Sequence, residues 1–329
     1  MKKILYFTLA GLMMVLGTTS CNKNLEGVEQ NELAKNASVI VDIQGLPMAV
    51  TKADYQTDNE KKVSQVDIAI YDASGVLEWS RHYNDARSSR QTITGLTVGK
   101  KTVAVAANLT IETIPTTLAA FKAYATDLKD NGRSNLVMFG SAEGMASSNP
   151  EAIELKLARV AAKFNLEGKI KTAWEGDAPA SFDITDIYVA NAAVASDFSY
   201  SGTAGPAVNL RSTVDLTTDP VYKDLTVATK TTWASGDAFN GGVNFYAYPN
   251  ADAARTCIMI KALYEEKVCY YPLVINQEIK NNTMYKIGDI TITCEGCENP
   301  WDDFTKIKIL FDIEVVDWDY NEVYPEFTF

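Results

Sequence analysis

Short segments in which apolar and polar residues alternate recur along the whole chain, and this pattern limits the possible folds more than any other feature. In Ser38 to Ile43, Val39, Val41 and Ile43 fall on one face of a strand with period two. Gly, Asn, Asp and Pro separate such segments at intervals typical of β-sandwiches. A mainly β fold is therefore expected, with strands at residues 38–43, 63–71, 76–83, 91–94, 101–107, 136–139, 153–157, 182–189, 243–248, 257–263, 268–275, 285–293 and 307–316.

One segment has helical periodicity instead. Pro115-Thr116-Thr117 precedes it as a start signal, and Asn131-Gly132 follows it as a stop signal. The apolar residues between them recur at helical spacing: Leu118, Phe121, Ala125 and Leu128. The sequence therefore predicts one accessory helix in the first half of the chain.

The length of 329 residues is enough for two domains. The run IELKLARVAAKFNL, residues 153–166, is consistent with one strand that closes a first domain and another that opens a second, with the boundary near Val160. We therefore predict two β-sandwich domains, residues 53–160 and 161–329, with the helix in the first. The segment Ser196 to Asn240 is rich in Thr, Ser and Gly, and we expect it to be an exposed spacer.

The first 21 residues have the features of an export signal. Lys2 and Lys3 precede an apolar run, Ile4 to Leu16, which as a helix would span about 20 Å, less than the roughly 30 Å of a bilayer core. Small residues then lead to Cys21, an arrangement that resembles a bacterial lipoprotein signal with Cys21 as the lipidated residue. Thr18 stands where such signals usually have Leu, and simple cleavage that leaves Cys21 idle is the alternative.

Composition excludes several classes of function. The chain has 30 basic and 42 acidic residues and a net charge of −12, which argues against binding to nucleic acid. It has one histidine, His82, so zinc fingers and other histidine-rich metal sites are not expected. No nucleophile elbow, phosphate-binding loop or metalloprotease motif is present. We expect neither an enzyme nor a cofactor or metal site.

Four cysteines follow Cys21, and the cysteines of an exported protein can be oxidised to disulfides. Cys294 and Cys297 could close a disulfide in a tight loop, or both could remain thiols. Cys257 and Cys269 lie on successive expected strands, so their approach depends on the register.

Several blocks, taken in order, resemble the type V pilins, the fimbrillin family of fimbrial subunits of Gram-negative anaerobes. The blocks are Val50-Thr51-Lys52-Ala53, IELKLARVAAKFNL (153–166), SFDITDIYVANA (181–192), NFYAYPN (244–250), NNTMYKIGDITI (281–292) and FDIEVVDW (311–318). The resemblance implies transthyretin-like sandwiches and a structural subunit of a cell-surface fimbrium that supports adhesion or biofilm formation. The implied partners are other copies of the chain and related fimbrial subunits.

The resemblance also implies a mechanism of assembly. Such pilins pass through the periplasm and reach the outer membrane as lipidated precursors, and a trypsin-like surface protease cuts after a basic residue. The cut removes the first strand, and a C-terminal strand of another subunit fills the groove. Here the matching bond is Lys52–Ala53, which makes residues 22–52 a propeptide; Lys61 and Lys62 are alternatives. Many members have Arg at this place, so a strictly arginine-specific protease would not serve.

The end of the chain is the expected donor strand. In Val323-Tyr324-Pro325-Glu326-Phe327-Thr328-Phe329, four residues share one face: Val323, Pro325, Phe327 and Phe329. The alternative is a tail that folds back onto its own domain.

Three other functions remain open from sequence. The chain could be an anchor subunit that keeps a lipidated Cys21, or a tip subunit. It could also be a surface lipoprotein that binds glycans through Trp174, Trp233 and Trp301. A host glycan or protein receptor is a further candidate partner.

Overall fold

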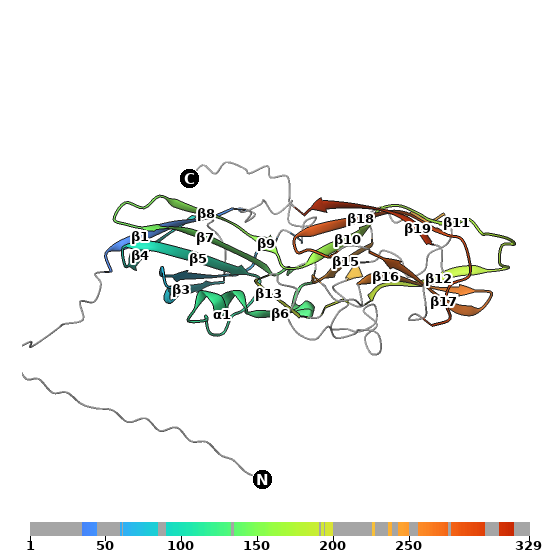
Figure 1. Ribbon diagram of the computed structural model, residues 1–329, viewed down its shortest axis with the longest axis horizontal. Coiled ribbons are helices and arrows are strands. Elements are labelled where there is room, and N and C mark those ends of the chain that lie inside the picture. Colours follow the sequence, from blue (N-terminus) through green and yellow to red (C-terminus); the bar gives the residue numbers. More distant parts are fainter. Residues whose placement is uncertain are drawn as a thin grey trace, which may run out of the picture. The chain divides into compact units, whose positions relative to one another are not determined.

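The computed structural model describes residues 35–44, 60, 62–84, 90–132, 135–190, 192–193, 195–199, 226–227, 236–238, 243–249, 256–275, 278–299 and 309–318. Strands dominate these residues, which confirms the expected mainly β, sandwich-like fold (Figure 1). Within this part of the chain, no helix is long and apolar enough to cross a membrane.

Apart from the short strand at residues 125–127, the strands up to residue 159 form two sheets, which together we call the N-terminal lobe. Their strand orders are β4-β1-β8 and β3-β2-β5-β7-β9. The bounds are β1 (Ala37–Gln44), β2 (Val66–Tyr71), β3 (Leu77–Tyr83), β4 (Arg90–Leu96), β5 (Gly99–Ala107), β7 (Met138–Ala146), β8 (Ala152–Lys156) and β9 (Ala158–Arg159).

Apart from the short strand at residues 195–197, the strands from residue 162 onward form two further sheets, the C-terminal lobe. Their orders are β11-β18-β10-β15-β14, with β19 beside β18, and β12-β16-β17. One apolar core runs through both lobes, so the domain boundary near Val160 stays a prediction. The bounds are β10 (Ala162–Leu166), β11 (Ile170–Thr172), β12 (Phe182–Ala190), β14 (Thr226–Val227), β15 (Val243–Ala247), β16 (Cys257–Tyr264), β17 (Lys267–Val274), β18 (Thr283–Ile292) and β19 (Ile309–Asp317).

A short two-stranded sheet joins the two halves of the chain. It pairs β6 (Ala125–Asp127) with β13 (Ala195–Asp197). The next residue, Phe198, is buried, and its ring stacks on Phe139 of β7 at 4.7 Å. The expectation of an exposed spacer is therefore wrong for residues 196–198, because this stretch fills a place in the core; most of the remaining spacer lies outside the described residues.

The predicted helix begins as expected but is much shorter. In α1 (Leu118–Lys122), the Thr117 hydroxyl accepts a hydrogen bond from the Ala120 N–H at 3.2 Å and caps the first turn. The chain then forms β6 and a short 3₁₀ turn, η3 (Leu128–Asp130), where the sequence predicts more helix. Pairing of β6 with β13 supplies backbone hydrogen bonds that compete with the helical ones, and this tertiary contact prevails over the local periodicity.

β2 and β3 pair antiparallel as a hairpin, and β3 carries the only histidine of the chain. The His82 Nδ1 atom lies 2.8 Å from Oδ1 of Asp67, a buried residue of β2. The His82 Nε2 atom lies 2.8 Å from the Asn84 Oδ1 atom. The hydrogen bond with Asp67 is the main reason that the pKa of His82 is raised.

The hydrogen bond between His82 and Asp67 predicts a pH dependence of the free energy of unfolding. Because the pKa of folded His82 lies above its unfolded value of about 6.5, the stabilisation is complete below that pH and is lost as the pH rises through the folded pKa. We expect the free energy of unfolding to fall between about pH 6 and pH 8, and to fall less in His82→Asn. Urea denaturation at both pH values tests this, and an equal fall in both proteins would contradict it.

Candidate functional site

Strand β1 lies in the middle of its sheet (Figure 1). It runs antiparallel to β4 and parallel to β8, so that Val41 lies opposite Gln91 on one side and Ile153 on the other. Both edges of its backbone are therefore paired. We call the space that β1 occupies between β4 and β8 the slot.

Side chains of β1 alternate between the core and the outer face. Ala37, Val39, Val41 and Ile43 are each at most 1% exposed, whereas the residues between them are half-buried. The prediction that Val39, Val41 and Ile43 share one face is confirmed. Full burial of one Val or Ile contributes about 1.5–3 kcal/mol, so apolar burial and the two ladders of hydrogen bonds hold β1 in place.

Polar links at the ends of β1 are few among the described residues. Ser38 and Ser147 exchange two backbone hydrogen bonds of 2.9 and 3.1 Å, and the Gln44 carbonyl accepts one from the Leu157 N–H at 3.4 Å. The ion pair between Asp42 and Arg90, at 3.8 Å, is largely exposed and adds little. Within the described residues, loss of β1 would therefore leave no buried charge without its partner.

Two glycines of β7 allow β8 to lie close against it. A Cβ atom at Gly144 would lie 2.4 Å from Cγ1 of Ile153, and one at Gly140 would lie 2.2 Å from the Lys156 carbonyl oxygen. Both distances are far shorter than van der Waals contact. The position of β8, which is one wall of the slot, therefore depends on these glycines.

The substitution Gly140→Ala should displace β8. We expect it to lower the free energy of unfolding by about 1–3 kcal/mol, the usual cost of overpacking. Gly288→Ala is the matched control, because its added methyl group would meet Asp312 Cβ at 3.5 Å and the Asp312 carbonyl oxygen at 3.7 Å, both ordinary contacts. Urea denaturation of both variants measures the difference, and equal stability would contradict the proposed role of Gly140.

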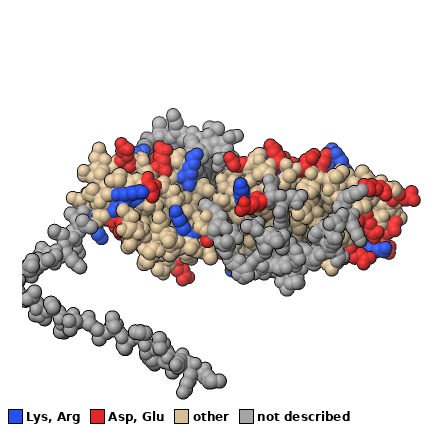
Figure 2. All heavy atoms as spheres, in the orientation of Figure 1, with Lys and Arg blue, Asp and Glu red and all other residues tan. Residues whose placement is uncertain are grey.

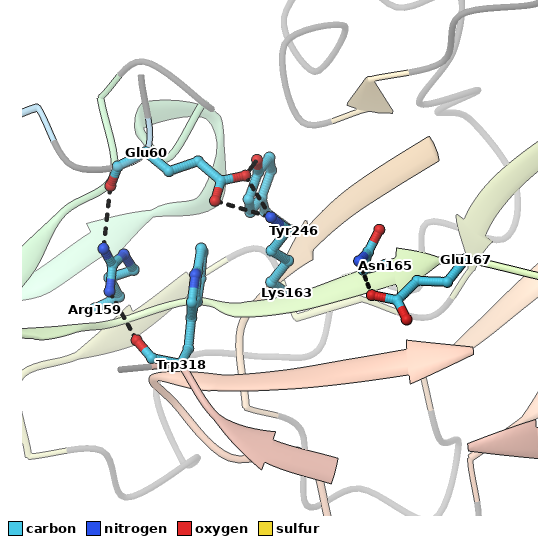
Figure 3. Close-up of polar contacts among 7 residues, drawn as sticks. All are labelled: Glu60, Arg159, Lys163, Asn165, Glu167, Tyr246 and Trp318. Atoms are coloured by element: carbon cyan, nitrogen blue, oxygen red, sulfur yellow. Dashed lines mark hydrogen bonds and ion pairs between the residues drawn. The ribbon is translucent and has the colours of Figure 1, made fainter. Parts of the chain in front are cut away.

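A second group of residues surrounds the buried carboxylate of Glu60 (Figure 3). The Lys163 Nζ atom lies 2.8 Å from Oε1 of Glu60, and the Tyr246 hydroxyl donates a hydrogen bond to the same oxygen. The Arg159 guanidinium donates to the Glu60 backbone carbonyl at 3.2 Å. Glu60 is thus fixed through both its side chain and its backbone, and its charge is balanced by Lys163.

Trp318, the last described residue, belongs to the same group. Its N–H donates to the Asn282 carbonyl at 2.9 Å, and its own carbonyl accepts from Arg159 at 3.0 Å. The Arg159 guanidinium lies over the indole ring, 4.5 Å from its centroid, and the Tyr246 ring stacks on it at 5.9 Å. Trp318 is only 1% exposed, so both its side chain and its backbone are held. We call Glu60, Arg159, Lys163, Tyr246 and Trp318 the junction cluster.

Sequence reasoning did not identify the junction cluster. Arg159 and Lys163 are basic residues in the otherwise largely apolar stretch 157–164, and this is the signal in the sequence that points to buried charges. A charge in a buried segment needs a partner. Nothing local marks Glu60 as that partner, since it lies 99 residues before Arg159 in the chain.

Most of the predicted site residues fall outside the described residues. These are the lipidation residue, the cleavage site and the donor strand: Cys21, Lys52, Ala53, Val323, Tyr324, Pro325, Phe327 and Phe329. Their roles stay predictions.

The four later cysteines lie in the C-terminal lobe. Cys257 pairs with Val274 and Cys269 with Ala262. Because Cys257 lies five residues along the strand from Ala262, about 17 Å, it is too far from Cys269 for a disulfide. Half-buried Cys294 and Cys297 lie in a loop that packs on β17, where the Tyr270 N–H donates to the Cys297 carbonyl at 2.8 Å. A Cys294–Cys297 disulfide stays a prediction.

Of the three tryptophans considered for glycan binding, Trp174 is described. Its ring packs edge-to-face on Phe182 and Tyr264, at 5.1 and 5.6 Å. These contacts give Trp174 a structural role in the lobe. Trp233 and Trp301 lie outside the described residues.

The charges on the surface are mixed. Figure 2 shows acidic side chains gathered at the end of the C-terminal lobe where β12 and β17 lie, with basic and acidic side chains interspersed elsewhere on this face. The turn between β16 and β17 carries two acidic residues, Glu265 and Glu266.

Comparisons with known proteins identify a matching family model and solved structures with a similar fold. The model of a family described as major fimbrial subunit protein (FimA) matches residues 38–168, which include all strands of the N-terminal lobe except the first residue of β1. No curated protein matches the chain.

Solved structures match most of the chain. A candidate cell adhesion protein from Bacteroides eggerthii has a TM-score of 0.62 at 15% identity, over 88% of this chain and 98% of that one. A fimbrilin (fimA) from Porphyromonas gingivalis has a TM-score of 0.56 at 16% identity, over 87% and 98%. At such identities the likeness concerns the fold. Together with the family match over residues 38–168, it confirms the resemblance of this chain to the fimbrillins.

Proposed function

We propose that the chain is a structural subunit of a surface fimbrium that assembles by exchange of strands between copies. The precursor is exported and lipidated on Cys21, a trypsin-like protease cuts it after Lys52, and β1 leaves. The C-terminal tail of another subunit then fills the slot. The match to a fimbrial subunit family supports a place at the cell surface and association with other fimbrial subunits.

The central position of β1 is the observation that carries this proposal. Its departure would leave the N–H and C=O groups of β4 and β8 unpaired beside an apolar floor. Such edges are costly in water and pair readily with another strand. An incoming strand would therefore recover both hydrogen bonds and apolar burial.

The contacts on either side of residues 45–59 support cleavage after Lys52 rather than after Lys61 or Lys62. Between Gln44, the end of β1, and Glu60, which the junction cluster fixes, Lys52 is the only basic residue. A cut after Lys61 or Lys62 would separate Glu60 from the rest of the subunit. Lys163 would then lose its buried partner, a change that typically costs 3–5 kcal/mol.

Lys62 is a poor site for a second reason. Its carbonyl accepts a hydrogen bond from the Asn108 side chain at 2.7 Å, and the same side chain accepts one from the Ser64 N–H at 2.8 Å. A protease needs a segment that it can draw into an extended form, so these hydrogen bonds protect the Lys62–Val63 bond.

The tail matches the slot in its pattern. β1 turns four residues toward the core, at every second position, and the tail has Val323, Pro325, Phe327 and Phe329 at the same spacing. Pro325 has no N–H, so one hydrogen bond of the ladder would be missing.

Trypsin cleavage tests the first step. We expect trypsin to cut the purified precursor to a stable fragment that begins at Ala53. The variant Lys52→Gln should resist this cut, because it lacks the only basic residue between Gln44 and Glu60. Lys62→Gln is the matched control and should be cut like the parent. Peptide mass gives the N-terminus. A fragment that begins at Lys62 or Val63, or a native surface protein that retains lipidated Cys21, would favour an anchor subunit or a different site.

Deletion of the tail tests the second step. The protein without residues 323–329 should be processed but should form no ladder of polymers on denaturing gels. If the tail is free before assembly, the free energy of unfolding should change by less than about 0.5 kcal/mol. A larger loss would show that the tail docks on its own domain, and normal polymers would overturn its role as donor.

A further inference from the structure

The tail and the slot are connected through one side chain. β8, a wall of the slot, ends at Lys156, and Arg159 follows three residues later. Arg159 in turn holds Trp318, from which the tail continues. This connection runs through residues 152–159 and Trp318 and bypasses the sheets of the C-terminal lobe.

We propose that Arg159 positions the root of the donor tail and carries tension along the fimbrium from the slot of one subunit to its own tail. The inference rests on the proposed function. A neighbour's strand in the slot pulls on β8, and β8 pulls on Arg159. Arg159 pulls on Trp318, whose tail is held by the next subunit.

Arg159 is suited to this task by its contacts. Its side chain donates to three acceptors: the Trp318 carbonyl at 3.0 Å, the Glu60 carbonyl at 3.2 Å and the Asn282 side-chain oxygen at 3.4 Å. Its backbone N–H also donates to the Asn282 side chain, at 3.1 Å. Hydrogen bonds from a charged group are about twice as strong as neutral ones. The planar guanidinium can reach several acceptors at once, which a lysine ammonium cannot do in the same geometry.

Without this tie, tension on the tail would reach β19 directly. Among the described strands, β19 pairs only with β18, and the pair nearest the tail is Asp317 with Thr283. A pull across the strands from that end would break the ladder one pair at a time, because each pair would bear the force in turn. Arg159 and Asn282 hold the two polar backbone atoms of Trp318, so the force meets them before it meets the ladder.

Single-molecule pulling tests the inference on the monomer. Handles at residue 151, which is exposed just before β8, and at residue 329 load the proposed connection. We expect Arg159→Lys to lower the force of the first rupture by roughly half, since lysine can keep only part of the charge-assisted bonds. An unchanged first rupture would overturn the inference, whether or not the protein forms fimbriae.

Lys101→Met is the matched control variant. It removes a buried ion pair of the N-terminal lobe, between Lys101 Nζ and Glu78 Oε2 at 2.6 Å, which lies off the proposed connection. We expect it to lower the stability of the monomer but to leave the first rupture unchanged. If it lowers the first rupture as much as Arg159→Lys does, the effect is general destabilisation and the inference is wrong.

Assembled fimbriae provide an independent readout. After equal shear, fimbriae of Arg159→Lys should be several-fold shorter than those of the parent or of Lys101→Met, because the tie is weakened at every joint. Equal lengths would contradict the inference. Failure of the processed parent to polymerise would instead contradict strand exchange and would leave the pulling result to decide the role of Arg159.

Discussion

The pairing of β1 along both of its edges is the constraint on which the N-terminal lobe depends. A strand at the edge of a sheet could leave without opening it, but β1 separates β4 from β8, so its departure would open the sheet. The glycines of β7 fix the distance of β8 from the sheet below, and β8 leads directly to Arg159. The slot, its wall and the junction cluster therefore form one continuous structure.

Features that depend on neighbouring residues could be predicted from the sequence. The alternation in β1 and the cap at Thr117 are both set within a few residues, and both agree with the structure. The prediction of helix beyond Lys122 is wrong because Ala125–Asp127 pairs as a strand with residues about 70 positions later in the chain. Helical spacing of apolar residues reports which side chains can be buried together, but it does not reveal that another strand competes for the same backbone groups.

The junction cluster could not be predicted for the same reason. Glu60, Arg159, Tyr246 and Trp318 come from distant parts of the chain, and only the fold brings them together. The sequence shows two basic residues in a largely apolar stretch, which implies buried partners without naming them. The cluster restricts the proposed cleavage more strictly than the sequence does, because Glu60 must stay with the subunit and Lys52 is the only basic residue between β1 and Glu60.

The energetics of β1 explain why the proposed cleavage would require the proposed strand insertion. Burial of Val39, Val41 and Ile43 contributes roughly 5–9 kcal/mol, an upper estimate because the unfolded chain already buries some surface. The net stability of a folded protein is only about 5–15 kcal/mol. A subunit that lost β1 and gained nothing would therefore be marginal, whereas the Val and Phe side chains of the tail can bury a similar apolar surface. Under the proposed function, β1 would allow the precursor to fold and be exported alone, and its removal would make the subunit dependent on a neighbour.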